Sequence, residues 1–257
     1  KKSFFPKRIE LRNIKNIIAI ASGKGGVGKS TVAANLALAL SKRDKKVGLI
    51  DADIYGPTIP SLFGVSGSLL VEGNKIKPIV KDNIKIISMG FLVEEKDAVI
   101  WRGPLISGAI KQFITDVDWG ELDFLVVDLP PGTGDASLTI AQLLPVTWVL
   151  IVTTPQKVAA RVALKAATMF QKLNIPVLGI VENMSYFKCP ACGKETEIFA
   201  RGGTEELKEK LNLDILVKLP FSKEFMEREE KGEIKNIDDI ENIFNNLALK
   251  VENKSRR

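Results

Sequence analysis

Histidine is absent from this sequence of 257 residues, and cysteine occurs only twice, as Cys189 and Cys192. Without an imidazole there is no histidine base and no histidine metal ligand, so acid–base and cation chemistry falls mainly to carboxylates. Two cysteines cannot build a disulfide framework. Their Cys-x-x-Cys spacing is instead typical of a metal site or a redox pair.

Long apolar runs are also missing. None reaches the roughly 20 residues that a membrane-spanning helix needs, and the basic residues near the N-terminus are not followed by the apolar stretch of a secretory signal. The net charge of +6 is spread along the chain, which indicates solubility more than nucleic-acid binding. We therefore expect a cytoplasmic protein without a membrane or nucleic-acid partner.

The length and the 45% hydrophobic content suit one large domain over residues 1–257, with a basic lead-in at 1–15, a cysteine-knuckle loop at 185–200 and a basic tail at 252–257. Strand-like and helix-like segments alternate, which predicts an α/β fold with a mostly parallel sheet. The expected strands are 16–22, 46–53, 83–89, 122–128, 147–153, 177–181 and 214–219. The expected helices are 31–43, 101–117, 137–144, 158–173, 204–211 and 237–251. A small inserted hairpin is expected at 66–80 and a Pro- and Gly-rich loop at 54–60.

A glycine-rich stretch joins the first expected strand to the first expected helix. Strand, glycine loop, Lys-Ser and helix in this order are typical of a phosphate-binding loop, or P-loop. The backbone N–H groups and the helix N-terminus face the phosphates. Lys29 is expected to reach the outer phosphates, and the Ser30 hydroxyl to ligate Mg²⁺. The predicted nucleotide-binding residues of the loop are Gly23, Lys24, Gly25, Gly26, Val27, Gly28, Lys29, Ser30 and Thr31.

The same stretch also fits the dinucleotide pattern Gly-x-Gly-x-x-Gly, and Asp51 stands where a ribose-binding acid would lie. Two features favour the P-loop. Lys29 and Ser30 follow the glycines directly, which a dinucleotide site does not need. The next strand also ends in two acids, Asp51 and Asp53, where one would suffice for a ribose.

Acidic residues at the strand ends supply the remaining chemistry of a nucleoside triphosphatase. Asp128 ends an apolar strand and is expected to hold the water shell of Mg²⁺, while Asp53 orients the attacking water and contacts the metal. Asp51 acts with Asp53 or lies in the metal's outer shell, and belongs to the predicted nucleotide site. Asp135 has two interpretations, a switch that responds to the phosphates or the N-cap of the following helix.

Several motifs resemble a known family. The stretch Lys24 to Ser30, Lys-Gly-Gly-Val-Gly-Lys-Ser, resembles the deviant Walker A motif of the SIMIBI-class ATPases, which include MinD and ParA. Five longer motifs are similar to the Mrp/ApbC group of iron–sulfur cluster carrier proteins. They are residues 51–57, 101–104, 128–135, 153–156 and 182–193.

The resemblance covers about residues 10–220 and implies a three-layer P-loop NTPase fold, with a twisted sheet and helices on both faces. It implies that ATP is held between two subunits and that Lys24 reaches the partner's nucleotide. The predicted catalytic residues are thus Lys24, Lys29, Asp53 and Asp128. The resemblance also implies that Asn183 contacts the adenine.

The sequence departs from the family pattern in three places. The helix after Thr153-Thr154-Pro155-Gln156 lacks the usual acid, the pattern Asp-x-Gly-x-Pro is degraded at 229–233, and the four-cysteine N-terminal segment of eukaryotic relatives is absent. No second cluster is therefore predicted.

Cys189 and Cys192 predict a shared metal site. Zinc and [4Fe–4S] sites usually take four protein ligands, whereas one chain offers two thiolates and no histidine. Two chains offer four, so a homodimer could hold one [4Fe–4S] cluster on its two-fold axis. Structural zinc and a redox dithiol remain alternatives.

These features predict a homodimeric ATPase that carries a [4Fe–4S] cluster to apo iron–sulfur proteins. A MinD/ParA-like positioning ATPase acting on membrane or DNA, and a zinc chaperone, are the alternatives.

Overall fold

The computed structural model describes residues 9, 11–54, 56–92, 103–189, 191–200, 202–234 and 238–255. Within these residues a nine-stranded sheet has the order β10-β9-β8-β1-β7-β2-β6-β5, with β11 also paired to β9. The parallel strands are β1 (Ile14–Ser22), β2 (Val47–Asp51), β6 (Ile84–Ser88), β7 (Leu122–Asp128), β8 (Trp148–Thr153), β9 (Val177–Lys188) and β11 (Ile215–Phe221). The short strands β5 (Ile79–Lys81) and β10 (Glu195–Thr196) pair antiparallel with β6 and β9.

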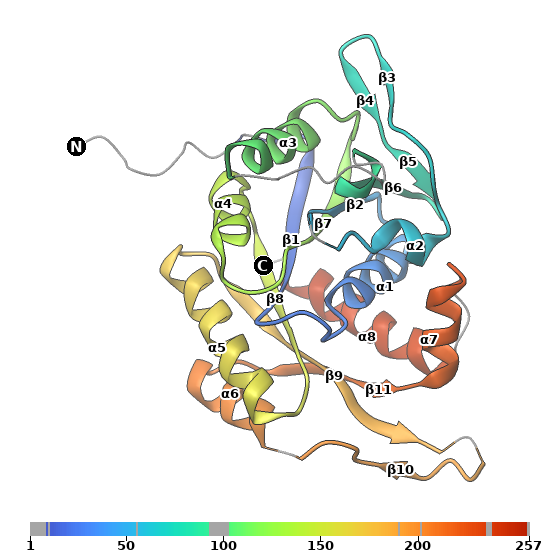
Figure 1. Ribbon diagram of the computed structural model, residues 1–257, viewed down its shortest axis with the longest axis vertical. Coiled ribbons are helices and arrows are strands. Elements are labelled where there is room, and N and C mark those ends of the chain that lie inside the picture. Colours follow the sequence, from blue (N-terminus) through green and yellow to red (C-terminus); the bar gives the residue numbers. More distant parts are fainter. Residues whose placement is uncertain are drawn as a thin grey trace.

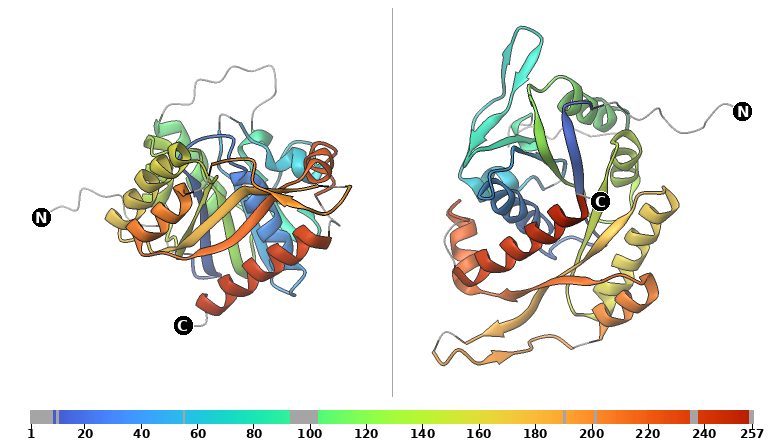
Figure 2. Two further views of the ribbon diagram at one scale, coloured as in Figure 1. Left: turned by 90° about the horizontal axis from the view of Figure 1, so that it is seen from below. Right: turned by 180° about the vertical axis from the view of Figure 1, so that it is seen from behind.

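Helices cover both faces of this sheet (Figure 1, Figure 2). One face packs against α3 (Gly103–Thr115), α4 (Asp135–Leu143), α5 (Lys157–Lys172) and α6 (Gly203–Leu211). The other face packs against α1 (Lys29–Ser41), α2 (Ile59–Phe63), α7 (Lys223–Glu230) and α8 (Asp238–Ser255). The three-layer α/β fold predicted from the sequence is confirmed.

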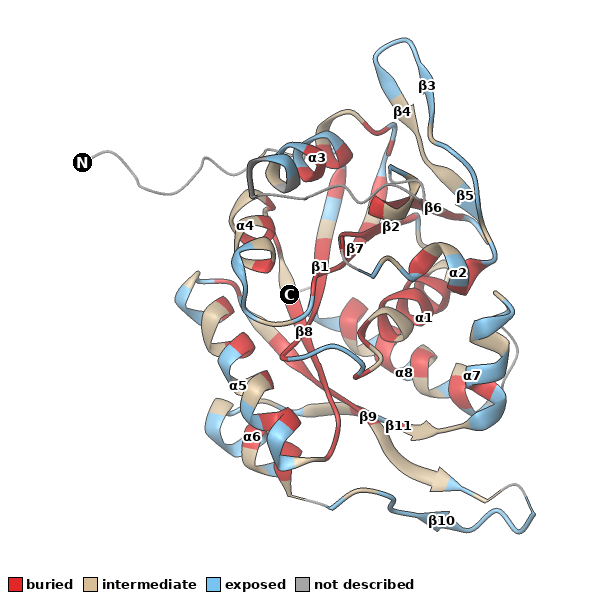
Figure 3. Ribbon diagram, in the orientation of Figure 1, coloured by how far each residue is buried: buried red, intermediate tan, exposed pale blue. Residues whose placement is uncertain are grey.

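The two-sided cover follows from the sequence of the central strands. In β1, Ile17 and Ala19 pack on one face, while Ile18 and Ile20 pack on the other. Because successive side chains of a strand alternate between faces, a strand covered on both sides must be apolar throughout. Figure 3 shows this as nearly continuous burial along β7 and β8.

The hairpin expected at 66–80 is present as β3 (Leu70–Glu72) and β4 (Lys75–Lys77), and both strands extend away from the central sheet (Figure 1). A short 3₁₀ helix, η1 (Met89–Phe91), follows β6. The expected tail at 252–257 is wrong for its first part, because α8 continues to Ser255. Parts of the expected lead-in, of the helix expected from residue 101 and of the expected tail lie outside the described residues. These parts are residues 1–8, 10, 101–102 and 256–257.

Three further expectations need correction. The strand expected to end at residue 181 continues to Lys188, because β11 pairs with it along its outer half. The cysteine loop expected at 185–200 therefore starts only after Lys188, and it contains the short strand β10. The loop expected at 54–60 gives way to α2 at Ile59, where Pro60 fits the first turn of a helix. The helix α7 has no counterpart among the expected elements. It begins after Ser222, whose hydroxyl accepts a hydrogen bond from the Phe225 N–H at 3.2 Å.

Candidate nucleotide site and cysteine pair

The glycine loop lies at the carboxyl end of β1 and leads into α1, whose N-cap is Gly28. Lys24, Gly25 and Gly26 are exposed at its tip. Gly28 has a φ of 81°, and a Cβ atom at this position would overlap the amide nitrogen of Asn183. Glycine is required here both by the left-handed backbone and by this close approach.

The loop lysine is buried between two acids. Lys29 Nζ lies 2.5 Å from Asp128 Oδ1 and 3.8 Å from Asp53 Oδ2. Burial raises the pKa of Asp128, and the positive charge of Lys29 opposes that rise. Asp128 Oδ2 is buried and has no hydrogen-bond partner in the described part of the chain. The Ser30 side chain hydrogen-bonds with the Asp128 carboxylate. This pair and the unpartnered Oδ2 fit a hydrated Mg²⁺ held by Ser30 and, through water, by Asp128.

Asp51 stands beside Asp128 on the neighbouring strand β2. Burial, followed by the repulsion of Asp128, raises its pKa to about 7. Its carboxylate accepts hydrogen bonds from the N–H groups of Asp53 and Ile59, at 3.2 and 3.1 Å, and from the Ser88 hydroxyl at 3.0 Å. These contacts shape the loop over the site. A contact of Asp51 with nucleotide or metal stays a prediction.

Asn183 closes the other side of the loop. Its side-chain amide donates to the Val27 carbonyl at 2.9 Å, and its Oδ1 accepts from the Met184 N–H at 2.9 Å. Asn183 is only 8% exposed and lies 156 residues away from Val27 in the sequence. The fold therefore brings the residue predicted to contact adenine directly against the P-loop.

Glu229 was not among the predicted site residues. Burial raises its pKa to about 7, although a hydrogen bond with the Thr31 side chain lowers it in part. One of its oxygens, Oε1, is buried without a hydrogen-bond partner within the described residues. Glu229 lies in α7, whose sequence is strongly polar and does not indicate a buried residue. The packing of α7 brings its carboxyl group to the start of α1.

Asp135 is the first residue of α4, and the N-cap is Gly134, which makes no side-chain capping bond. The N-cap interpretation of Asp135 is therefore wrong. Its exposed carboxylate lies in the first turn, where the helix dipole favours a negative charge. The interpretation as a switch stays a prediction.

The cysteine pair lies on a tight turn after β9. The Cys189 N–H donates to the Lys194 carbonyl at 2.9 Å, and the Gly193 N–H donates to the Cys189 carbonyl at 2.8 Å. Backbone N–H groups of Ala191 and Cys192, and then the Cys192 thiol, lower the pKa of Cys189. Both thiols are free, and Cys192 is exposed. Among the described residues no cluster of three or more Cys, Asp or Glu side chains could hold a metal.

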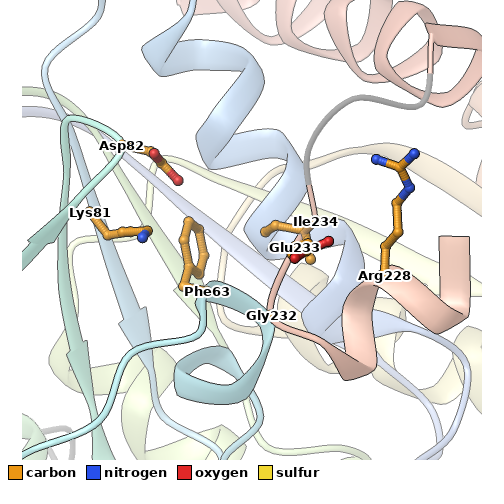
Figure 4. A pocket seen from close by; sticks show the side chains of 7 residues that line it. All are labelled: Phe63, Lys81, Asp82, Arg228, Gly232, Glu233 and Ile234. Carbon is orange, nitrogen blue, oxygen red and sulfur yellow. The ribbon is translucent and has the colours of Figure 1, made fainter.

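The two predicted sites are separated in space but share one strand. Asn183 and Cys189 are six residues apart in the sequence, which limits their separation to roughly 20 Å, the length of six extended residues. A separate cavity of about 250 Å³ lies between α2, α7 and residues 81–82 (Figure 4). Arg228 lines that cavity, whereas the predicted nucleotide residues do not. Where the helices are described, none combines the length and apolar character needed to cross a membrane.

The loop, its buried lysine and the acids at the strand ends define a P-loop NTPase. The ParA family model described as the NUBPL iron-transfer P-loop NTPase matches residues 13–253, and the chain belongs to this family. The resemblance to the cluster carrier group stated from the motifs is thereby confirmed.

Curated relatives carry names that agree with this family. The iron-sulfur cluster carrier protein of Aquifex aeolicus is 48% identical over 88% of this chain, which spans 63% of that relative's length. The iron-sulfur cluster transfer protein NUBPL of Mus musculus is 46% identical, covering 89% of this chain and 72% of that protein. An iron-sulfur cluster carrier protein of Methanocaldococcus jannaschii is 47% identical, covering 96% of this chain and 89% of that protein.

Solved structures show the same architecture. A nucleotide-binding protein of Archaeoglobus fulgidus in complex with ADP superposes with a TM-score of 0.77 and 43% identity, covering 86% of this chain and 88% of the other. The cell division ATPase MinD of Pyrococcus furiosus has a TM-score of 0.68 over 93% of this chain and 99% of its own. At 22% identity the MinD likeness shows the fold alone.

Proposed function

We propose that this chain is an ATP-hydrolysing iron–sulfur cluster carrier. In this proposal two copies hold one [4Fe–4S] cluster with four thiolates, Cys189 and Cys192 from each chain, and deliver it to apo iron–sulfur proteins. The observation that carries the proposal is the turn with two free thiols, in a member of an iron-transfer family. Among the described residues no cluster of three or more Cys, Asp or Glu offers a complete metal site of its own. The lowered pKa of Cys189 favours the thiolate that binds iron.

The nucleotide chemistry follows from the buried cluster of charges. Lys29 leaves Asp128 to compensate the outer phosphates of ATP, and Asp53 orients the attacking water. Mg²⁺, held by Ser30 and the Asp128 side of the site, would neutralise charge on the phosphates. Lys24 lies exposed at the tip of the loop, where a second subunit can approach. Its action on the partner's nucleotide is part of the proposal.

Anaerobic reconstitution with iron and sulfide tests this function. We expect about four irons per dimer, visible as a broad absorption band, and transfer of the cluster to an apo acceptor protein. Cys189→Ser and Cys192→Ser should each abolish stable binding, whereas Lys194→Ala, a change in the same turn, should bind the cluster normally. Iron binding that is unaffected by both cysteine variants would overturn the proposal.

Metal analysis of protein purified without air separates this proposal from the zinc alternative. Zinc at the cysteines, with no cluster formed on reconstitution, would point to a zinc chaperone. The alternative of a positioning ATPase rests on the shared fold with MinD and on no contact in the site.

A further inference from the structure

A bulge interrupts β9 between the two proposed sites. On β11, Lys218 pairs with Glu182 and Pro220 with Tyr186, so that Leu219 alone stands opposite residues 183–185. In the middle of this bulge Met184 has a φ of 54°, a left-handed conformation that non-glycine residues seldom adopt within a strand. Such strain persists only where surrounding contacts hold it in place.

The inner end of the bulge is tied to the P-loop. Through its side-chain amide, Asn183 contacts the Val27 carbonyl on one side and the Met184 N–H on the other. The amide nitrogen also fills the space that a side chain at Gly28 would need. A shift of the loop or of Asn183 therefore acts directly on the strained residue.

The outer end of the bulge is fixed to the sheet beside open space. The Ser185 hydroxyl donates to Glu182 Oε1 at 2.5 Å, and the buried Glu182 lies 3.5 Å from Lys218 Nζ. A cavity of about 530 Å³ borders Ser185 and Tyr186, so these side chains can move without displacing packed core residues.

Beyond the bulge, β9 is less buried, although it pairs with β11 on one edge and β10 on the other. Residues 177–183 are mostly buried, whereas 184–187 are only partly buried, a change visible along the strand in Figure 3. This outer half then continues into the turn that carries Cys189 (Figure 1). If the bulge straightened into regular strand, its two extra residues would shift the outer half of β9 by up to roughly 7 Å along β11.

We propose that the bulge of Asn183, Met184 and Ser185 is a positioning element that sets the location of the cysteine pair according to the nucleotide in the P-loop. Nucleotide contacts at Asn183 change the support of the left-handed Met184. When the bulge loses its shape, the outer half of β9 shifts along β11 and carries the thiols with it. This inference rests on the proposed function, to which it adds the route between the two sites.

The test uses two substitutions at Met184 with opposite backbone preferences. Glycine favours the left-handed conformation, whereas valine disfavours it strongly. The readout is the rate of thiol alkylation by iodoacetamide in the full-length, metal-free protein, measured with and without ADP or a non-hydrolysable ATP analogue. In the native protein we expect nucleotide to change this rate by about threefold or more.

Met184→Gly and Met184→Val should shift the rate measured without nucleotide in opposite directions, and both should reduce the nucleotide-dependent change. ADP affinity, measured by calorimetry on the same samples, should stay within about twofold for Met184→Gly. Asn212→Val is the matched control, because Asn212 has a φ of 50° at the end of α6, outside β9. It should lower stability but leave the thiol response unchanged.

Two results would overturn the inference. One is a native thiol rate that does not respond to nucleotide, and the other is a full response in both Met184 variants. Because the assay contains no iron, the coupling can fail while reconstitution still shows a cluster. Conversely, loss of cluster binding with an intact thiol response would count against the proposed function and leave the coupling standing.

Discussion

Lys29 Nζ lies 2.5 Å from Asp128 Oδ1, and the two side chains are 6% and 0% exposed. The residue expected to bind phosphate is thus paired with the residue expected to hold the water shell of Mg²⁺. A buried ion pair is costly to leave half-complete, because the remaining charge has neither water nor a counterion. Lys29 can therefore leave Asp128 only when another anion takes its place, which the phosphates of a nucleotide supply.

Asp128→Asn should reveal this exchange. Loss of one partner from a buried pair costs about 3–5 kcal/mol of unfolding free energy, and we expect the lower end because Asp53 stays near Lys29. MgADP should restore much of the lost stability, since its phosphates compensate Lys29, while ATP hydrolysis stays abolished. Thermal unfolding with and without MgADP measures the difference.

Glu121→Gln is the control, since it removes an ion pair with Lys46 whose side chains are 65% and 82% exposed. It should change the unfolding free energy by less than about 1 kcal/mol. An equal loss of stability in both variants, or a loss in Asp128→Asn that MgADP does not reduce, would contradict the exchange.

The P-loop and the acids could be predicted from sequence because their positions follow from local rules. A glycine loop between an apolar strand and a helix fixes Lys29 and Ser30, and an acid that ends a parallel strand reaches the same edge of the sheet. The carboxylates of Asp53 and Asp128 accordingly lie near Lys29. What the motif did not indicate is that Lys29 and Asp128 bind each other.

The outer half of β9 could not be predicted in the same way. The stretch from Glu182 to Ser185 is polar, and polar residues after an apolar strand are typical of a loop. It forms a strand because β11, which begins more than 25 residues later, pairs with it across the Met184 bulge. Glu229 was missed for a related reason, since its burial depends on how the polar helix α7 packs.

Gly28→Ala should be far more damaging than Gly25→Ala, although both change a glycine of the same loop. A Cβ atom on Gly28 would overlap the Asn183 amide on a left-handed backbone, whereas one on Gly25 would meet no atom within 4 Å. We expect Gly28→Ala to lower the unfolding free energy by about 1–3 kcal/mol and to weaken ADP binding. Gly25→Ala should change stability by less than about 0.5 kcal/mol. Chemical denaturation and calorimetry measure both, and similar losses in the two variants would show that Asn183 does not confine the loop.

Glu229 should make stability depend on pH. Its pKa rises from 4.5 to about 7 in the folded chain, so between these values the unfolded chain releases a proton that the folded chain retains. The unfolding free energy therefore falls as pH rises from 4.5 to 7, and stays at the lower value above that range. Glu229→Gln removes the effect, because glutamine is neutral throughout.

We expect Glu229→Gln and the native protein to unfold at similar temperatures at pH 5. At pH 8 the variant should be more stable by on the order of 3.5 kcal/mol, because the pKa rise from 4.5 to about 7 is multiplied by about 1.4 kcal/mol per pKa unit. The exposed neighbour supplies the control Glu230→Gln, which should follow the native curve. If the stability of the native protein and of Glu229→Gln changed in parallel from pH 5 to 8, ionisation of Glu229 would not lower the unfolding free energy.

Mixing two inactive variants can show whether Lys24 acts on its own nucleotide or on that of a partner. Lys24→Ala should bind ADP with native affinity, because Lys24 is exposed, yet hydrolyse ATP about 100-fold more slowly for want of a positive charge in the transition state. Lys29→Ala should not bind nucleotide but retains Lys24. In a mixed dimer, the Lys24→Ala subunit holds ATP and its partner supplies Lys24, so mixing should restore part of the activity.

Lys165→Ala is the control, because it removes an exposed lysine of α5, and it should be active alone. A mixture as inactive as its two components would place Lys24 on the nucleotide of its own chain, and hydrolysis would then give no argument for a dimer.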